Sequence, residues 1–328
     1  MAAGLSVIVP NYNGSETIGK CLDALYSSDY GDFEVIVVDD CSDDGSADII
    51  SLRPCRLVML DARSGAARAR NRGAAESSGD ILFFIDADCI VRPDTVSAAV
   101  AACRGHEGTV FGGTYTRTAH DDTFFSTFQS IFINYFETKR SEPDYIASHA
   151  MVINRKMFLE SGGFPHDFLP IIEDVEFSHR IRRSGAKLAM APDLLVSHIF
   201  NFTLLKSLKN AFRKSRYWTA YSMQNRDLLS DSGTASAELK INVVSYSLTL
   251  LMMLLSVAFH SVLFLLPATG IFLFNLGFNR NFLKAFFETK GPVSGTLSTL
   301  YYTLLYPAAI AAGSLTGMVE HYARFRRG

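Results

Sequence analysis

Three short apolar runs near the start of the chain are each followed by polar side chains that could bind a metal ion and an anionic ligand. The runs cover residues 5–10, 33–38 and 81–85. Carboxylates gathered in one place repel one another unless a cation or hydrogen-bond donors lie among them. Oxygen ligands suit Mg²⁺ or Mn²⁺, so we predict a divalent cation that assists the binding of an anion. The polar residues that follow the runs are Asn11, Tyr12, Asn13, Asp39, Asp40, Asp86 and Asp88.

The elements that must position these residues alternate between strands and helices. Helical spacing or composition over residues 16–27, 46–52 and 66–77 separates the apolar runs, and residues 56–60 read as a further short strand. Such alternation predicts an α/β fold with a mostly parallel sheet covered on both faces. Ligands of open α/β sheets bind outside the carboxyl ends of the strands, so the polar residues should converge at one edge.

The C-terminal part of the chain has a different composition. Residues 241–279 contain no Asp, Glu, Lys or Arg, and residues 293–319 form a second uncharged stretch. Crossing a bilayer takes about 20 apolar residues, so both stretches are long enough. We predict a catalytic domain over residues 1–199, a juxtamembrane amphipathic segment over 200–240, and a transmembrane region of two to four helices over 241–328. The number of spans and the side of the C-terminus stay open.

The juxtamembrane segment carries cations beside an apolar stripe at helical spacing. This arrangement is typical of a helix that lies among lipid headgroups, which makes membrane lipid an expected partner. A helix packed on the soluble domain is the alternative. The cations are Lys206, Lys209, Arg213, Lys214 and Arg216.

Charge, cysteines and the first residues indicate where the protein works. The formal net charge of −2 lacks the basic excess of nucleic-acid-binding proteins, so we expect no nucleic-acid partner. The five cysteines form no CxxC pair and no zinc spacing, which is typical of reduced cytosolic thiols. No leader-like segment precedes Leu5. We therefore expect a multi-pass protein of the cell membrane with its catalytic domain in the cytoplasm.

Five motifs in order resemble glycosyltransferase family 2, whose members are inverting enzymes with the GT-A fold that use nucleotide-activated sugars. The resemblance covers roughly residues 5–198, and five motifs in order are far more specific than an isolated DxD. The motifs are the first strand and loop at 7–13, a VDDxSxDGS-like element at 37–46, an ARNxG…GD-like segment at 69–80, the DxD at 86–88 and the ED pair at 173–174.

The resemblance also implies a set of nucleotide-sugar-binding residues. Asp40, with Asp39, would contact the base or ribose, and Pro10 with Tyr12 would form the wall of the nucleotide pocket. Arg70 or Arg68 would approach the nucleotide or its phosphates, although an exposed helix arginine without a ligand is an equal alternative. The whole set is Pro10, Tyr12, Asn13, Asp39, Asp40, Arg68, Arg70 and Asp86.

Metal ligands and catalytic residues follow from the same resemblance. Asp88, together with Asp86, would hold a divalent cation against the leaving diphosphate, and His198 would be a further ligand or a phosphate contact. Asp174 would be the general base that inversion by single displacement requires. Glu173 beside it should raise its proton affinity. The alternative is that both acids stabilise the start of a helix at 175–183.

These features imply transfer of a sugar from a nucleotide-diphosphate donor to a lipid-linked or other saccharide acceptor near the membrane. A polyprenyl phosphate acceptor, which needs little base, is the first alternative. A nucleotidyltransferase is the second, although residues 9–13 lack a basic glycine-rich phosphate loop. A catalytically inactive scaffold is the third. Processive members carry QxxRW, and residues 215–218 lack its glutamine, so addition of one sugar per encounter is expected.

Overall fold

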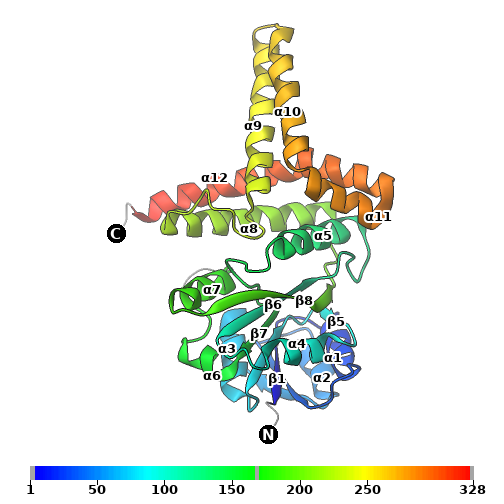
Figure 1. The fold of residues 1–328 in the computed structure, drawn as a ribbon, viewed down its shortest axis with the longest axis vertical. Helices are drawn as coiled ribbons and strands as arrows, with labels where there is room; N and C mark the ends of the chain where they lie inside the picture. Colours follow the sequence, from blue (N-terminus) through cyan, green and yellow to red (C-terminus); the bar gives the residue numbers. More distant parts are fainter. Residues whose placement is uncertain (1–3, 167–169, 326–328) are drawn as a thin grey trace. The chain divides into compact units, whose positions relative to one another are not determined.

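The computed structural model describes residues 4–166 and 170–325. It contains two compact units, which are described separately below (Figure 1). The sheet unit comprises Met1–Asp122 and Glu137–Asn201, and the helical unit comprises Thr123–Phe136 and Phe202–Gly328.

The sheet unit is built on a mixed sheet, which confirms the predicted α/β class. Strands β3, β2, β1 and β4 are parallel, whereas β7 runs antiparallel to both β4 and β6, and β5 runs antiparallel to β8. The three predicted runs all form strands, and two of them extend one residue further than expected. In order across the sheet the strands are β3 (Arg56–Met59), β2 (Phe33–Asp39), β1 (Leu5–Asn11), β4 (Ile81–Ile85), β7 (Ala150–Asn154), β6 (Thr109–Tyr115), β8 (Lys187–His198) and β5 (Cys89–Val91).

Helices of the sheet unit connect these strands, as the alternation in the sequence predicted. The parallel half of the sheet receives α1, α2 and α3 between its strands, and α7 precedes β8. Their bounds are α1 (Ile18–Tyr26), α2 (Ser46–Ser51), α3 (Ala66–Glu76), α4 (Thr95–Cys103), α6 (Arg155–Glu160) and α7 (Glu173–Arg183).

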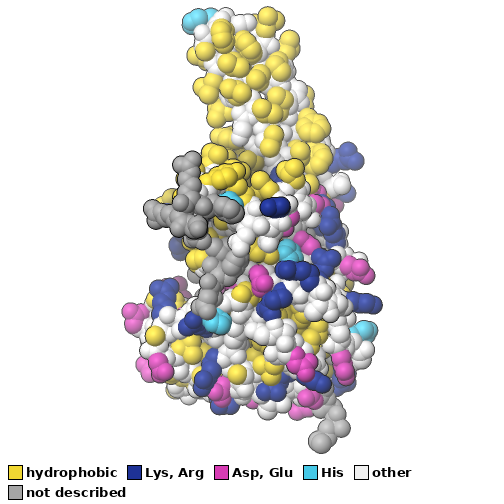
Figure 2. Space-filling view, turned by 90° about the vertical axis from the view of Figure 1, so that its left-hand side faces the viewer, with side chains coloured by type: hydrophobic (Ala, Val, Ile, Leu, Met, Phe, Trp, Pro, Cys, Tyr) yellow, Lys and Arg dark blue, Asp and Glu magenta, His cyan; other side chains and the backbone are white. Residues whose placement is uncertain are grey.

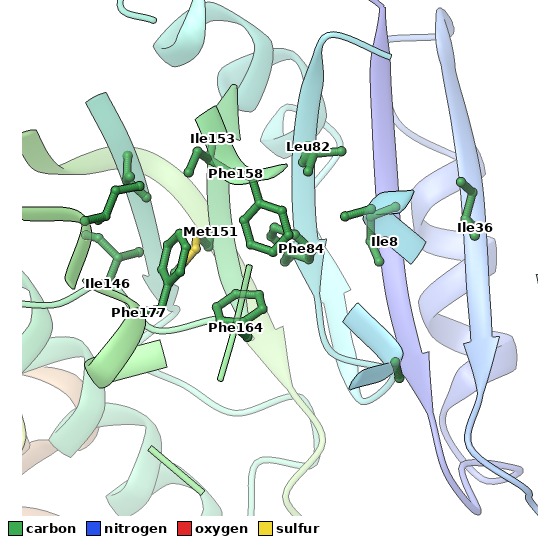
Figure 3. Close-up of a cluster of buried hydrophobic side chains, with 14 of the residues drawn as sticks. Ile8, Ile36, Leu82, Phe84, Ile146, Met151, Ile153, Phe158, Phe164 and Phe177 are labelled. Carbon is green, nitrogen blue, oxygen red and sulfur yellow. The ribbon is translucent and has the colours of Figure 1, made fainter. Parts of the chain in front are cut away.

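A cluster of buried apolar side chains fixes α6 and α7 against the sheet (Figure 3). The ring of Phe84 on β4 lies 4.9 Å from that of Phe158 on α6 and 5.2 Å from that of Phe164. Phe177 on α7 packs on Phe164 with ring centroids 4.9 Å apart. Tilted and edge-on aromatic pairs add to the stability that burial of their area supplies. The first turn of α7, where the sequence placed the catalytic acids, is thereby fixed to the central strand.

The helical unit is held by close contact of two long helices. Ideal Cβ atoms at Gly313 and Gly317 would each lie 2.3 Å from a backbone oxygen, that of Phe212 and that of Arg216 respectively, so only glycine permits this approach of α12 to α8. Arg216 also pairs with Glu320, with Nε and Oε2 2.9 Å apart. The helices of the unit are α5 (Phe124–Thr138, whose last residues belong to the sheet unit), α8 (Leu204–Asn225), α9 (Ala237–Ala258), α10 (Leu265–Phe278), α11 (Arg280–Leu300) and α12 (Tyr306–Phe325).

Within the helical unit, α9 and α10 form a hairpin whose surface is apolar (Figure 2). Two helices in the described part of the chain are long and apolar enough to cross a membrane, Ala237–Ala258 and Arg280–Ala323. The second is interrupted, because Gly291 has a φ of 75° and residues Tyr301–Leu305 form a π-helical turn. Length and composition alone identify these helices. They indicate membrane association without supporting the predicted multi-pass topology.

Candidate active site

Asp39, at the end of β2, is fully buried and holds the neighbouring loops together. Its Oδ1 accepts hydrogen bonds from Asn11 Nδ2 at 2.7 Å and from Ser42 Oγ at 2.6 Å. Its Oδ2 accepts from the Ser42 backbone N–H at 2.9 Å. A buried carboxylate needs such donors, and these three fix the ends of β1 and β2 relative to each other. Asp39 therefore fixes the ends of β1 and β2, and its predicted contact with base or ribose stays a prediction.

Asp40 is also buried and binds the loop that leads into α3. Its two carboxylate oxygens accept the backbone N–H groups of Ser64, at 2.5 Å, and Gly65, at 2.8 Å. Gly65 has a φ of 88° and immediately precedes the helix. Asp40 thus orients the start of α3, which carries Arg68 and Arg70. The contact with base or ribose that the resemblance implies stays a prediction.

Tyr12 and Asn13 follow β1 at the same edge of the sheet. The guanidinium carbon of Arg63 lies 4.0 Å from the centroid of the Tyr12 ring, and that ring is 41% exposed. Asn13 donates from Nδ2 to Asp43 Oδ1 at 2.8 Å, and Pro10 is half-buried at the end of the strand. The sequence reasoning missed Arg63, because a loop arginine carries no signal of the ring it covers.

Arg70 is the buried cation of the site. Its side chain is 5% exposed and forms ion pairs with Asp86 at 2.5 Å and with Glu173 at 2.8 Å. Burial lowers the pKa of a guanidinium, but here the carboxylates of Asp86 and Glu173 outweigh burial and raise it. Arg68, on the same helix, is exposed. Of the two arginines that the sequence left as alternatives, Arg70 is the one in the acidic cluster.

Asp86 and Asp88 follow β4, and antiparallel pairing of β5 with β8 brings His198 beside them. The Nε2 atom of His198 lies 3.3 Å from Asp88 Oδ1. Burial raises the pKa of Asp88, and the charge of Asp86 adds to this against the opposing effect of His198. For Asp86 burial acts in the same direction, but the charge of Arg70 outweighs it and the pKa lies below its usual value.

These side chains fit a divalent cation. Ligand atoms of Asp88, Cys89 and His198 all lie within 4.8 Å of one another. Burial and the two aspartates raise the pKa of Cys89 well above its usual value, so the carboxylate of Asp88 and the imidazole of His198 are the favoured donors. The Nδ1 atom of His198 is buried and has no hydrogen-bond partner among the described residues. A carboxylate with one imidazole suits Mn²⁺ or Mg²⁺, whose other ligands are commonly waters and substrate phosphates.

Glu173 and Asp174 begin α7. The preceding residue, Ile172, adopts a left-handed φ of 82°, which is unusual for a β-branched residue and marks local strain. Asp174 is partly buried, and its oxygens accept the N–H groups of Ser148 at 3.1 Å and Val175 at 2.9 Å. Burial, followed by the charge of Glu173, raises the pKa of Asp174 to about 6. The bond to Val175 also shows part of the helix-start role that the sequence offered as the alternative.

Arg70 is therefore the residue that brings the predicted metal and catalytic acids together. It joins Asp86, which follows β4, to Glu173 on α7, and its charge acts on Asp174 as well. Asp39 and Asp40, after β2, accept hydrogen bonds from Asn11 on β1, from Ser42 and from the loop before α3. The site combines an ionised Asp86, a half-exposed Asp88 beside His198, and the partly buried Asp174, whose raised pKa lets it exchange a proton near neutral pH.

Comparisons with known proteins agree with this architecture. Residues 6–161 match the model of "Glycosyl transferase family 2". The chain is 30% identical over 206 residues to Glycosyltransferase AglE of Haloferax volcanii, covering 59% of this chain and 66% of that protein. It is 40% identical over 90 residues to Amylovoran biosynthesis glycosyltransferase AmsB of Erwinia amylovora, covering 25% of this chain and 30% of that one. The chain thus spans less than two thirds of either relative.

Among solved structures, the fold resembles the mannosyltransferase PcManGT from Pyrobaculum calidifontis, determined in complex with GDP-Man and Mn²⁺. The TM-score is 0.60 at 18% sequence identity, and the match covers 98% of this chain and 88% of that one. At this identity the likeness concerns the fold.

Proposed function

We propose that this chain, which belongs to glycosyltransferase family 2 and has the GT-A fold, transfers a sugar from a nucleotide-diphosphate donor to an acceptor at the membrane. The observation that carries the proposal is the cluster in which Arg70 pairs with Asp86 and Glu173 beside the partly buried Asp174. A partly buried acid with a raised pKa, next to a candidate metal site at the ligand-binding edge of an α/β sheet, is typical of a catalytic centre.

Donor binding is assigned to the metal strand and its neighbours. Asp88 and His198, with Asp86, would hold a divalent ion, which supplies positive charge to the leaving diphosphate. The fold relative that was solved with GDP-Man and Mn²⁺ supports this choice of donor and ion. Arg70 keeps Asp86 ionised at neutral pH and so preserves its ability to bind a cation.

Asp174 acts as the general base in the proposed single displacement. With a pKa of about 6 it is mostly ionised at pH 7, yet it is basic enough to accept a proton from an acceptor hydroxyl. Attack by that hydroxyl on the face of the sugar opposite the diphosphate inverts the anomeric carbon. Glu173 contributes through its charge, which raises the pKa of Asp174, while its own carboxylate binds Arg70.

The test compares Asp174→Asn with Asp23→Asn, a change at a side chain that is 65% exposed. We expect Asp174→Asn to retain cation-dependent nucleotide binding in calorimetry and to lose about 10²- to 10⁴-fold in turnover with a hydroxyl acceptor. Screening nucleotide sugars with and without Mn²⁺ identifies the donor. Full activity of Asp174→Asn on a hydroxyl acceptor would contradict the assigned role.

The same assay separates the alternative reactions. A phosphate acceptor such as a polyprenyl phosphate arrives already ionised, so transfer to it should depend only weakly on Asp174. Release of pyrophosphate instead of a nucleoside diphosphate would favour a nucleotidyltransferase. Nucleotide binding that needs no cation and yields no product would favour a scaffold.

The acceptor is proposed to be lipid-linked because of the α9–α10 hairpin. Leu254, Val257 and Leu266 on its surface are 59%, 71% and 73% exposed. Such side chains are costly in water and favourable in a bilayer. We expect the full chain to float with liposomes and the double variant Leu254→Lys/Leu266→Lys to float less. Leu229→Lys, at a site 89% exposed outside the hairpin, is the control that should leave flotation unchanged.

A further inference from the structure

We propose that His149 is a positioning residue for the catalytic base Asp174. Its imidazole anchors the short turn before β7, and the backbone N–H of Ser148 in that turn orients the Asp174 carboxylate. The inference rests on the proposed function, because it gives Asp174 the role of base. His149 stands outside the donor and metal sets assigned above.

The imidazole of His149 is stacked on one ring and lies beside one carboxylate. The residue is 7% exposed, and its ring stacks on that of Tyr115 with centroids 4.1 Å apart and an interplanar angle of 26°. Its Nε2 atom lies 3.6 Å from Oε2 of Glu137. The stack fixes the plane of the ring, and the Glu137 carboxylate lies at its edge beyond hydrogen-bond distance, where it acts on the imidazole through its charge.

The carboxylate beside His149 is itself bonded to the sheet. Thr114 Oγ1 donates to Glu137 Oε2 at 2.6 Å, and both side chains are buried. Thr114 and Tyr115 are the last two residues of β6, so ring stack and carboxylate are fixed by the same strand end. The end of β6 therefore contacts both the stacking ring and Glu137, which belongs to α5.

The anchored turn delivers its hydrogen bond to the base. Ser148 precedes His149 and is buried, and its N–H donates to Asp174 Oδ2 at 3.1 Å. The other oxygen, Oδ1, is occupied by the N–H of Val175. The Oδ1 bond lies within α7 itself, whereas the bond from Ser148 to Oδ2 comes from the turn before β7. The Ser148 bond therefore orients the Asp174 carboxylate relative to the sheet. A longer or misaligned bond weakens this orientation steeply.

A weaker bond from Ser148 should change the pKa of Asp174, which can be measured as a shift in the pH profile of kcat/KM. On α7 Glu173 opposes ionisation of Asp174, and from α3 the guanidinium of Arg70 favours it. Asp86 and Glu173 bind that guanidinium, and His149 lies one residue beyond the Ser148 donor. The Ser148 N–H lowers the pKa of Asp174, so its loss raises that pKa further.

The experiment measures kcat/KM against pH for the full-length enzyme with a hydroxyl acceptor. His149→Phe keeps an aromatic ring on Tyr115 but removes the pair with Glu137. We expect the acid limb of its kcat/KM profile to move upward by about one pH unit. Weakening of the hydrogen bond from Ser148 to the charged Asp174 carboxylate predicts a shift of this size. His149 also acts on Asp86 through its charge, and Tyr115 lies 4.9 Å from the ring of His198, so nucleotide affinity with Mn²⁺ is measured for each variant. A change in that affinity without a shift of the acid limb would overturn the inference.

Two further variants keep the inference testable. Glu137→Gln conserves the volume and weakens the anchor, so it should shift the limb in the same direction by less, and it replaces His149→Phe if that variant misfolds. The control is His179→Phe, which breaks another His–carboxylate pair, with Asp144 at 3.9 Å, and should leave the limb in place. Combined with Glu137→Gln, His149→Phe should add little, since both act on one contact.

The outcomes separate this inference from the proposed function. An inactive Asp174→Asn enzyme together with unshifted limbs in His149→Phe and Glu137→Gln would overturn the positioning role and leave the base assignment standing. Full activity of Asp174→Asn would remove the base itself. A loss in His149→Phe that appears equally at all pH values, with a raised donor KM, would show direct substrate binding and also overturn the inference.

Discussion

Replacing Arg70 with methionine tests whether the buried cation holds the acidic site together. Arg70→Met keeps the volume of the side chain but leaves the carboxylates of Asp86 and Glu173 without their shared partner. Removing one member of a buried ion pair costs about 3–5 kcal/mol. The Asp86 side chain is 29% exposed, so water recovers part of this and we expect about 3 kcal/mol.

The loss is measurable as a change in thermal unfolding of the full-length protein in detergent, with hydrogen exchange in β1 and β4 reporting on the sheet unit. For a unit of this size, about 3 kcal/mol lowers the unfolding midpoint by about 6–12 °C. The matched control is Arg72→Met on the same helix, whose side chain is 54% exposed and pairs with Glu76 at 2.7 Å. An exposed pair of this spacing contributes about 0.3–0.5 kcal/mol, or about 1–2 °C.

The stability that the Arg70–Asp86 pair contributes should depend on pH. Burial raises the pKa of Asp86, but Arg70 outweighs burial, so the folded pKa lies below the ordinary 3.8. Stability from the pair is therefore complete well above pH 3.8 and is lost as the pH falls through the folded value. The deficit of Arg70→Met should be full at neutral pH and shrink below about pH 4. Midpoints for Arg70→Met and Arg72→Met that agree within about 2 °C at pH 7 would refute the reasoning.

Three further predictions concern the base, the metal site and the helical unit. Glu173→Gln removes the like charge beside Asp174, so the acid limb of kcat/KM, expected near pH 6 in the native enzyme, should move to lower pH; an upward shift would contradict this electrostatic account. His198→Ala removes the one imidazole donor and should weaken Mn²⁺ binding in calorimetry by about tenfold or more, and unchanged affinity would exclude His198 as a ligand. Gly313→Leu places a side chain where a Cβ already meets the Phe212 carbonyl at 2.3 Å, so thermal unfolding of the helical unit should occur at lower temperature. Gly270→Leu on α10, where nothing lies within 4 Å of an added Cβ, is its control.

Local sequence signals were sufficient for the first half of the sheet and the edge at which polar residues gather. The runs at 5–10, 33–38 and 81–85 are mostly apolar on both faces, as buried parallel strands are, and a polar residue directly follows each one. The choice between Arg68 and Arg70 was not decided by motif. Arg70 lies on the helix face of Gly73 and Ala74, which are also buried, and this i, i+3, i+4 spacing could have identified it.

Contacts between distant parts of the chain could not be read in the same way. Arg70 and Glu173 are 103 positions apart, and nothing near either residue specifies the other. The same holds for α5, where the sequence analysis singled out no element. Phe128 and Phe132 of this helix pack on Phe286 and Phe282, at 5.2 and 5.7 Å between ring centroids, and so place most of α5 in the helical unit. An aromatic run shows that a helix is buried but not what buries it.

The two acidic pairs of the site show why residue type alone does not assign a role. Asp39 and Asp40 accept hydrogen bonds from the loops near β2 and before α3, and they fix those loops and the start of α3. Asp86 follows β4, which β1 separates from β2 in the sheet, and it pairs with a guanidinium from that same helix α3. Asp40 thus acts on the reactive acids indirectly, because the loop it orders leads into the helix that carries Arg70. Asp40 fixes the loop before α3, and Arg70 on α3 lowers the pKa of Asp86 and keeps it ionised.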